Sequence, residues 1–330
     1  MKRIAIILPG RGSYTEKSMG ALPPEHPWVQ RVDELRVGYG LTKLTDLDTA
    51  EKFSGAVHLR PANVSALIWI GSMLDAQAAM NEGRCVAVAG NSMGWYTALA
   101  VTGALDFDDG FRLVQEMSLL QEELRGGGQC IYPLIDDHWR PDAERRTAVK
   151  SAVASSGGEA FHSIDLGGYA VLAGSDVGMA HLMRALPPLQ VGQARYPFKL
   201  VQHGPYHTPL TAEVSEQARA RLARLTWRRP TIPMVDGRGV RFTPWSTDVR
   251  ALRDYTLKTQ VIEPYDFSSS VRVLLREYAP EAIYLPGPGN TLGGVCGQIL
   301  IAEGWRRILS RADFESAQAQ DGAPLVSMRR

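Results

Sequence analysis

The sequence has few cysteines, little net charge and no long hydrophobic run. Three cysteines occur in 330 residues, far apart and without any Cys-x-x-Cys or Cys/His pair: Cys85, Cys130 and Cys296. An odd number of scattered cysteines argues against a disulfide framework and against a metal cage. We therefore expect three reduced thiols in a cytoplasmic protein, and no metal site.

The charge balance and the apolar segments exclude further classes of protein. Lys and Arg total 36 and Asp and Glu total 35, so the formal net charge of +1 favours neither nucleic acid nor a membrane as a partner. No segment approaches the length of a membrane span, and the apolar residues 4–8 are too few for a secretory signal. Residues 126–128 are glycines without the Lys-Ser/Thr of a phosphate loop, so we expect a hinge there and no cofactor.

Glycine is abundant by contrast, and two of the 32 glycines frame the most informative motif. Gly90-Asn-Ser92-Met-Gly94 follows the apolar residues 85–89 and precedes a helical pattern at residues 95–100. Gly-x-Ser-x-Gly between a strand and a helix is typical of a nucleophile elbow, where glycines permit a sharp turn. The amide of the next residue, Met93, is then free to bind an oxyanion. The motif predicts Ser92 as a nucleophile.

Strands and helices alternate over the first third of the chain. We expect strands at residues 4–8 and 85–89, and helices at residues 63–81, 95–100 and 108–124. This alternation predicts an α/β fold with a mainly parallel sheet and helices on both faces.

The pattern changes after Gly128. The next elements follow a β-α-β-β-α-β order, with strands at residues 130–135, 161–166, 169–173 and 191–196 and helices at residues 141–154 and 176–186. This order is the split, ferredoxin-like arrangement. We predict a small ferredoxin-like subdomain at residues 129–199, inserted into a large domain made of residues 1–128 and 200–330.

The large domain then resumes. Thr208-Pro209 predicts a helix start, with Thr208 as the cap and Pro209 in the first turn. Further helices are expected at residues 249–257, at 267–278 and from 291, with a strand at 282–285. The tail from about residue 316 is polar and rich in small residues, and we expect it to be mobile.

Five stretches carry a resemblance to a known family, in that family's order and spacing. They are Leu8-Pro-Gly-Arg-Gly-Ser13, Gly90-Asn-Ser-Met-Gly-Trp-Tyr-Thr-Ala-Leu99, Gly204-Pro-Tyr-His-Thr-Pro-Leu210, Gln260-Val-Ile-Glu-Pro264 and Gly287-Pro-Gly-Asn-Thr-Leu292. They resemble motifs of the malonyl-CoA:acyl carrier protein transacylases and of the acyltransferase domains of polyketide synthases. The match covers nearly the whole chain, which is identified as a divergent member with a hydrolase-like core.

The resemblance implies an acyl exchange between two thiols through an acyl-serine, with acyl carrier protein and an acyl-CoA or other acyl thioester as partners. It implies Ser92 as nucleophile, His207 as general base, and Gln260 orienting the imidazole through its main-chain carbonyl. The Met93 and Arg11 amides would form the oxyanion hole. His207 precedes a predicted helix, so we expect the helix dipole to keep its imidazole neutral. His203, four residues upstream, is taken as a histidine without a catalytic role.

The resemblance also suggests residues that bind the substrate. They are Gly10, Asn63, Asn91, Trp95, Glu116, Met117 and Tyr206. Malonyl-specific members carry an Arg that holds the malonyl carboxylate, and this position falls here on Glu116, or on Met117 if the gap moves by one. Neither side chain can replace a guanidinium fork. We therefore expect a non-malonyl, non-dicarboxylic acyl group, and a pocket made more apolar by Trp95 and Met117.

Three alternatives stay open. The chain could be a malonyl transacylase in which Arg11 or Arg125 supplies a displaced cation. It could be a hydrolase that strips acyl groups from carrier proteins, with water in place of the second thiol. It could also be a scaffold without catalysis, although the joint presence of Ser92, His207 and Gln260 argues against that.

An acidic carrier protein would need a basic docking patch, which the resemblance leads us to expect. Two clusters qualify: Arg140, Arg145, Arg146 and Lys150 in the subdomain, and Arg219, Arg221, Arg224, Arg228 and Arg229 after His207. The sequence does not rank them.

Overall fold

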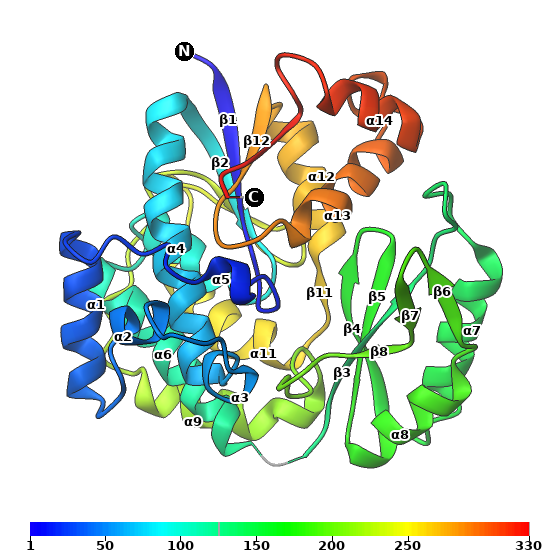
Figure 1. The fold of residues 1–330 in the computed structure, drawn as a ribbon, viewed down its shortest axis with the longest axis horizontal. Coiled ribbons are helices and arrows are strands. Elements are labelled where there is room, and N and C mark those ends of the chain that lie inside the picture. Colours follow the sequence, from blue (N-terminus) through cyan, green and yellow to red (C-terminus); the bar gives the residue numbers. More distant parts are fainter. Residues whose placement is uncertain (125, 330) are drawn as a thin grey trace.

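The computed structural model describes residues 1–124 and 126–329. A six-stranded sheet runs through the larger part of the molecule, with strand order β10-β9-β2-β1-β12-β13 (Figure 1). Its strands are β1 (Arg3–Leu8), β2 (Arg84–Gly90), β9 (Met234–Val235), β10 (Arg241–Phe242), β12 (Ala282–Leu285) and β13 (Leu325–Ser327). Every pairing is parallel except that of β9 with β10. The predicted α/β class with a mainly parallel sheet is confirmed.

The central strand β1 is buried on both faces, as expected for a parallel sheet covered by helices on each side. Ile4, Ile6 and Leu8 pack in one core with residues of α4, α5 and α6, whereas Ala5 and Ile7 pack in a second core with residues of α12 and α13. The bounds of these helices are α4 (Pro61–Glu82), α5 (Gly94–Val101), α6 (Phe107–Glu123), α12 (Phe267–Tyr278) and α13 (Thr291–Ala302). The smaller helices of the N-terminal part are α1 (Pro27–Gly38), α2 (Leu44–Asp48), α3 (Gly55–His58) and the 3-10 turn η1 (Glu16–Ser18).

A second sheet, drawn in green in Figure 1, has the order β11-β4-β5-β3-β8. Its members are β3 (Gly128–Pro133), β4 (Ala160–Leu166), β5 (Tyr169–Gly174), β8 (Phe198–Lys199) and β11 (Tyr265–Asp266), with α7 (Ala143–Ala154) and α8 (Asp176–Ala185) packed against it. The order β4-β5-β3-β8 is antiparallel throughout, which is the ferredoxin-like arrangement. The fifth strand, β11, joins β4 in parallel from the far part of the chain. The domain limits of residues 129–199 stay a proposal.

One strand of this sheet was predicted in the wrong place. Residues 191–196 do not form the fourth strand. They belong to a separate hairpin of β6 (Leu189–Val191) and β7 (Ala194–Tyr196), which turns at Gly192 with a φ of 58°. The fourth strand is β8, whose Phe198 and Lys199 pair with β3. The hairpin residues are half-buried or exposed, so they lack the buried face that a sheet strand needs.

The C-terminal tail is structured, so the expectation of mobility was wrong. Helix α14 (Arg311–Gln318) is followed by β13, which adds a parallel edge strand to the main sheet. Phe314 and Leu325 are buried in the core beside α12 and α13. The side-chain amide of Gln318 also donates to Leu325 O at 2.6 Å and accepts from Leu325 N at 3.2 Å. Two apolar side chains among polar neighbours therefore anchor the tail.

The predicted helix start at Thr208 also needs a correction. Pro209 begins only a 3-10 turn, η2 (Pro209–Thr211), and the α-helix α9 runs from Ala212 to Arg221. The Thr208 hydroxyl donates to Pro205 O at 2.6 Å and caps neither element. In the part of the chain that the structure describes, no helix is both long and apolar enough to cross a membrane. The cytoplasmic location stays a prediction.

Candidate active site

Ser92 lies at a sharp turn between β2 and α5. Its φ is +52°, a left-handed conformation that non-glycine residues adopt only under strain and that is typical of functional turns. A Cβ on Gly90 would lie 2.2 Å from the carbonyl carbon of Gly94, and a Cβ on Gly94 would lie 2.2 Å from Leu8 O. Both positions therefore require glycine, and the turn has the geometry of a nucleophile elbow.

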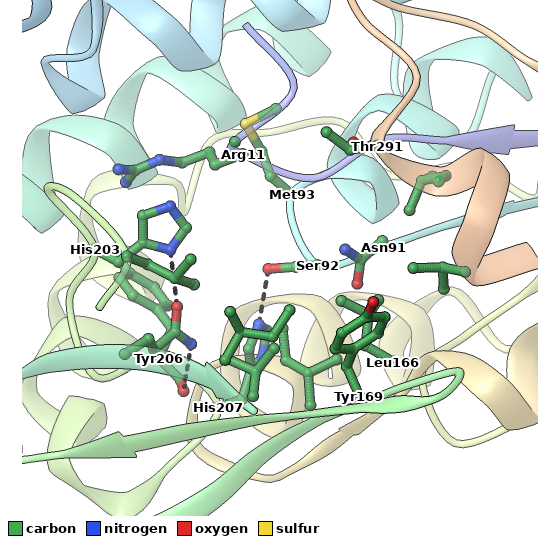
Figure 2. A pocket seen from close by; sticks show the side chains of 18 of the residues that line it. Arg11, Asn91, Ser92, Met93, Leu166, Tyr169, His203, Tyr206, His207 and Thr291 are labelled. Atoms are coloured by element: carbon green, nitrogen blue, oxygen red, sulfur yellow. Dashed lines mark hydrogen bonds between the residues drawn. The ribbon is translucent and has the colours of Figure 1, made fainter. Parts of the chain in front are cut away.

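His207 reaches Ser92 from a distant part of the chain. Its Nε2 lies 2.8 Å from Ser92 Oγ (Figure 2). Its Nδ1 lies 2.5 Å from the main-chain oxygen of Gln260. A carbonyl oxygen can only accept, so Nδ1 carries the proton and Nε2 presents a lone pair. Ser92 must then donate its hydroxyl proton toward Nε2. This is the arrangement that a serine nucleophile and its general base need.

An irregular helical segment holds Gln260 in place. The predicted helix at residues 249–257 divides into α10 (Val249–Asp254), a π-helical turn η3 (Tyr255–Thr259) and the short α11 (Gln260–Ile262). π-helical turns are frequent at functional sites because they shift the following carbonyls out of the α-helical register. The Gln260 amide donates to Ser92 O at 2.8 Å, and His207 N donates to Val261 O at 2.8 Å. Three segments are thus joined around one serine.

Burial keeps the His207 imidazole neutral. Desolvation lowers the pKa of His207 to about 4, and the hydrogen bond to the Gln260 carbonyl opposes this shift. The neutral imidazole was expected, but from a helix dipole. The α-helix that follows begins only at Ala212, five residues further on, so burial is the principal cause.

Two amides near Ser92 remain available as donors. Neither Met93 N nor Arg11 N donates a hydrogen bond to another residue in the described part of the chain. Met93 precedes α5, and Arg11 lies in the turn after β1. Backbone donors left open beside a nucleophile are suited to an oxyanion.

A cavity of about 400 Å³ surrounds Ser92. Figure 2 shows the serine with Arg11, His203 and Tyr206 on one side and Leu166, Tyr169 and Thr291 on the other. The first side also includes Met117 and Gln121 of α6, and the second includes residues of the small sheet and of α13. Among the described residues that line the cavity, none is Asp or Glu and only Arg11 is a Lys or Arg.

The α6 wall resolves the ambiguity between two adjacent positions. Met117 lines the cavity, whereas Glu116 does not. The Glu116 carboxylate lies 3.7 Å from Arg221, and burial together with the nearby Glu116 charge raises the pKa of the Tyr39 phenol. Successive side chains of a helix point about 100° apart, and here positions 117 and 118 face the cavity while position 116 is turned toward Arg221. Of the two predicted residues only Met117 faces the cavity, and Glu116 as a substrate-binding residue was wrong.

Three more predicted substrate residues lie away from the cavity. Trp95 is fully buried in the core against Tyr255, and its Nε1 donates to Thr256 Oγ1 at 2.9 Å. The Asn63 amide accepts a hydrogen bond from Arg36 Nη2 at 2.6 Å and donates one to Val57 O at 2.9 Å. Gly10 is closely covered, because a Cβ there would lie 2.8 Å from Asn91 O. Asn91 and Tyr206, also predicted, do line the cavity.

Arg11 brings a positive charge to the cavity. Its guanidinium donates to Gln121 Oε1 and to the main-chain oxygen of Gln202, while its buried Nε has no hydrogen-bond partner. Burial lowers the pKa of Arg11 to about 10, so the group stays charged at neutral pH. Arg125, the other cation considered from the sequence, lies outside the described residues.

Sequence reasoning missed most of the lining. His203 and Gln121 face the cavity, as do Trp139, Leu166 and Tyr169. His203 stands in the same motif as His207, and Gln121 one helical turn after Met117, so both could have been found. The residues of the small sheet and α13 carried no comparable signal. In the described part of the chain no group of three or more His, Cys, Asp or Glu side chains could hold a metal ion.

The chain is similar to several known proteins. No protein-family model matches it. The malonyl CoA-acyl carrier protein transacylase of Salmonella typhimurium is 26% identical over 310 residues, or 91% of this chain and 94% of that protein. The Escherichia coli K12 transacylase is 25% identical over 307 residues, again 91% and 94%. The polyketide biosynthesis protein ThaF of Burkholderia thailandensis is 25% identical over 299 residues, or 90% of this chain but 24% of that protein.

Solved structures agree in fold. An acyl carrier protein S-malonyltransferase from Vibrio cholerae superposes with a TM-score of 0.73 at 21% identity, covering 90% of this chain and 94% of that one. The malonyl CoA-acyl carrier protein transacylase of Coxiella burnetii gives 0.75 at 16% identity, covering 99% and 94%. The resemblance predicted from the motifs and the hydrolase-like core with its ferredoxin-like subdomain are confirmed.

Proposed function

We propose that this chain, a divergent relative of the malonyl-CoA:acyl carrier protein transacylases, is an acyltransferase that works through an acyl-Ser92 intermediate. It takes an acyl group from an acyl-CoA or acyl carrier protein thioester and gives it to the phosphopantetheine thiol of an acyl carrier protein. The observation that carries this proposal is the 2.8 Å contact of Ser92 Oγ with a neutral His207 whose other nitrogen is held by Gln260 O. The names of the similar proteins support the reaction class.

In the first half-reaction, Ser92 Oγ attacks the thioester carbonyl carbon as its proton passes to His207 Nε2. The Met93 and Arg11 amides hold the oxyanion of the tetrahedral intermediate. Its collapse breaks the carbon–sulfur bond, and the departing thiolate takes the proton from Nε2. In the second half, His207 takes the proton of the acceptor thiol. The thiolate attacks the acyl-serine, and Ser92 leaves with the proton.

We further propose that the acyl group is not malonyl. The resemblance expects the carboxylate-binding Arg at Glu116, or at Met117 if the gap moves by one. Glu116 does not line the cavity, and the thioether of Met117, which does, cannot neutralise a carboxylate. An unpaired carboxylate in a closed site is strongly disfavoured. Leu166, Val171 and Val295 make the other side of the cavity apolar.

One observation favours a second candidate, malonyl transfer with a displaced cation. Arg11 has no acidic partner among the described residues, and its Nε lacks any partner. A buried guanidinium without a counter-ion attracts anions. In that case Arg11, rather than a residue of α6, would hold the malonyl carboxylate.

Loading of Ser92 separates the two candidates. The protein would be incubated with malonyl-CoA, acetyl-CoA and butyryl-CoA, and the adduct measured by intact mass. Loading of acetyl or butyryl groups at a rate above malonyl supports the non-malonyl proposal, whereas loading of malonyl alone contradicts it. Under the second candidate, Arg11→Gln would abolish malonyl loading and spare acetyl loading. Free acid formed in the presence of acceptor carrier protein would indicate hydrolysis instead of transfer.

The acidic carrier protein requires a basic patch, and five of the nine predicted cations are engaged within the chain, four in ion pairs and Arg229 in a hydrogen bond to Thr247 O. Arg140 pairs with Asp136 and Arg145 with Asp142, while Arg221 pairs with Glu123 and Arg228 with Asp106: the contact distances are 2.8, 3.0, 2.6 and 3.5 Å. No ion pair is formed by Arg146, Lys150, Arg219 or Arg224 with a described residue. We propose that these four are the residues to reverse in charge, with a raised carrier-protein KM and an unchanged acyl-CoA KM as the expected result.

A further inference from the structure

His203 lines the same side of the cavity as Arg11 and Tyr206 (Figure 2). It lies four residues before His207, and its Nδ1 is 2.9 Å from Oε1 of Gln129 in β3. No step of the proposed reaction uses it. An imidazole that faces the cavity can donate or accept a hydrogen bond there, and its neighbours determine which.

A chain of hydrogen bonds determines which nitrogen of His203 carries the proton. Ser163 Oγ lies 2.9 Å from the main-chain oxygen of Tyr206, which can only accept, so the Ser163 hydroxyl proton is committed there. Ser163 Oγ must therefore accept the 2.8 Å hydrogen bond from Gln129 Nε2. The amide orientation of Gln129 is then determined, and its Oε1 faces His203.

It follows that His203 donates through Nδ1 and carries a lone pair on Nε2. Among the described residues, Nε2 has no hydrogen-bond partner. Burial lowers the pKa of His203 well below the ordinary value, and the nearby charge of Arg11 lowers it further. The imidazole is therefore neutral, and Nε2 is an acceptor that never becomes a donor at neutral pH.

Arg11 and Tyr206, which lie on the same side of the cavity as His203, both contact α6 (Figure 2). Tyr206 OH donates to Met117 O at 3.2 Å, and Arg11 bonds Gln121 on the next turn of α6. The resemblance places the carboxylate-binding Arg of malonyl-specific members at Glu116, or at Met117 if the gap moves by one, and of these two only Met117 lines the cavity. Arg11 Nε, on the same side, is a buried donor without a partner. This side thus offers one unused acceptor and one unused donor next to an otherwise apolar methionine.

We propose, resting on the function proposed above, that His203 is a specificity-determining residue that accepts a hydrogen bond from a hydroxyl on the acyl chain. A hydroxyl is both donor and acceptor at a single atom, so it can donate to His203 Nε2 and accept from Arg11 Nε. A plain alkyl chain would cover Arg11 Nε, a buried donor, without giving it a partner, which is unfavourable, and it would leave the His203 Nε2 acceptor unused. The substrates of this enzyme are then hydroxyacyl thioesters.

The test compares acyl donors that differ by one oxygen. Butyryl-CoA and its 2-, 3- and 4-hydroxy derivatives, together with octanoyl-CoA and 3-hydroxyoctanoyl-CoA, are mixed with the protein, and the rate of Ser92 acylation is followed by quenched intact mass. At least one hydroxyacyl donor should load about tenfold faster than its alkyl twin, because one hydrogen bond to a buried group is worth about 1.4 kcal/mol.

Two variants separate recognition from structure. In His203→Asn the side-chain amide can still donate to Gln129, but the acceptor at the Nε2 position is gone. It should lose the preference for the hydroxyl, so that the hydroxyacyl and alkyl donors of one pair load at equal rates. In His203→Gln the longer amide reaches the Nε2 position, and part of the preference should return.

Three results would overturn the proposal. Equal loading of every hydroxyl and alkyl pair by the wild-type protein removes its basis. An equal slowing of all donors by His203→Asn assigns His203 to the pantetheine arm or to the packing of the loop. If no donor acylates Ser92 at all, the proposed function itself fails, and the inference about His203 falls with it.

Discussion

His203 and His207 stand at the two ends of one short loop and face one cavity, yet their surroundings give them different chemistry. Both are neutral and both carry the proton on Nδ1. The proton of His207 is held by a main-chain carbonyl, that of Gln260. The proton of His203 is held by side chains, those of Gln129 and, through it, Ser163. Nε2 of His207 faces Ser92, whereas Nε2 of His203 has no hydrogen-bond partner among the described residues.

This difference indicates which of the two roles, catalysis by His207 or substrate preference through His203, tolerates substitutions around it. A main-chain carbonyl is present whatever residue occupies position 260, so the His207 tautomer survives substitution there. The His203 tautomer depends on Gln129 and Ser163, two residues of the small sheet. We therefore expect reactivity to be robust and substrate preference to be easily changed.

The largest loss of activity should come from removing the nucleophile Ser92, whose hydroxyl contacts His207. Ser92→Ala removes the attacking oxygen, so the transfer rate should fall by about 10⁴-fold or more, and no adduct should form with any donor. Transfer assays and intact mass check this. Ser155→Ala, at the exposed end of α7, is the matched control and should behave as wild type. An adduct persisting on Ser92→Ala would place the nucleophile elsewhere.

Removing the base comes next and separates the two histidines directly. His207→Ala should slow acylation by about 10³-fold for every donor, since general base catalysis typically contributes that much. His203→Asn should change only the ranking of donors. Acylation rates across the donor panel measure both, with the exposed His138→Ala as the control. Similar losses of acylation rate in His207→Ala and His203→Asn for every donor would contradict different roles for the two histidines.

A side-chain change at position 260 tests the role of the main-chain carbonyl. Gln260→Ala keeps the carbonyl that holds His207 and loses only the 2.8 Å bond to Ser92 O. The loss of one hydrogen bond corresponds to a decrease in kcat of about tenfold or less. Steady-state kinetics on an acyl donor that loads well would measure it. A loss as large as that of His207→Ala would mean that the side chain, and not the carbonyl, orients the imidazole.

The smallest effect concerns pH. Because the pKa of His207 is lowered to about 4, half of the protein should still hold a neutral base near that pH. The acid limb of kcat/KM should therefore have its midpoint near pH 4, and a midpoint near pH 6.5 would contradict the burial of the imidazole. In the unfolded chain, His207 binds a proton below about pH 6.5, whereas in the folded protein it does so only near pH 4. The free energy of unfolding should consequently fall as the pH drops from there toward 4, which urea titrations would detect.

Much of the site could be predicted because its motifs are local. The elbow depends on two glycines within five residues, and Ser92, His207 and Gln260 each stand in a short stretch with a recognisable pattern. Trp95 was misplaced for the opposite reason. Which face of α5 points to the core is determined by Tyr255 and Thr256, which lie far along the chain.

The sequence could not decide between Glu116 and Met117 for the same reason, because the deciding contacts come from residues far along the chain. A helical pattern shows that one of two neighbours faces inward, but only the packing of α6 against Tyr39 and Arg221 decides which. The C-terminal tail was misjudged because its apolar residues are few and have no helical or strand periodicity that marks Phe314 and Leu325 as buried. These two side chains stabilise the tail only because they pack against the buried residues of α12 and α13.

The amino-acid sequence alone determined the alternation of strands and helices in the first third of the chain, the sharp turn at Ser92 and the resemblance to a family of acyltransferases. These follow from residue spacing and from the steric freedom of glycine, which act over a few residues. The tertiary structure decided which side chains face the cavity, why His207 stays neutral and which nitrogen of His203 is open to a substrate. Those properties depend on burial and on hydrogen bonds between residues that are far apart in the chain, and such contacts exist only once the chain has folded.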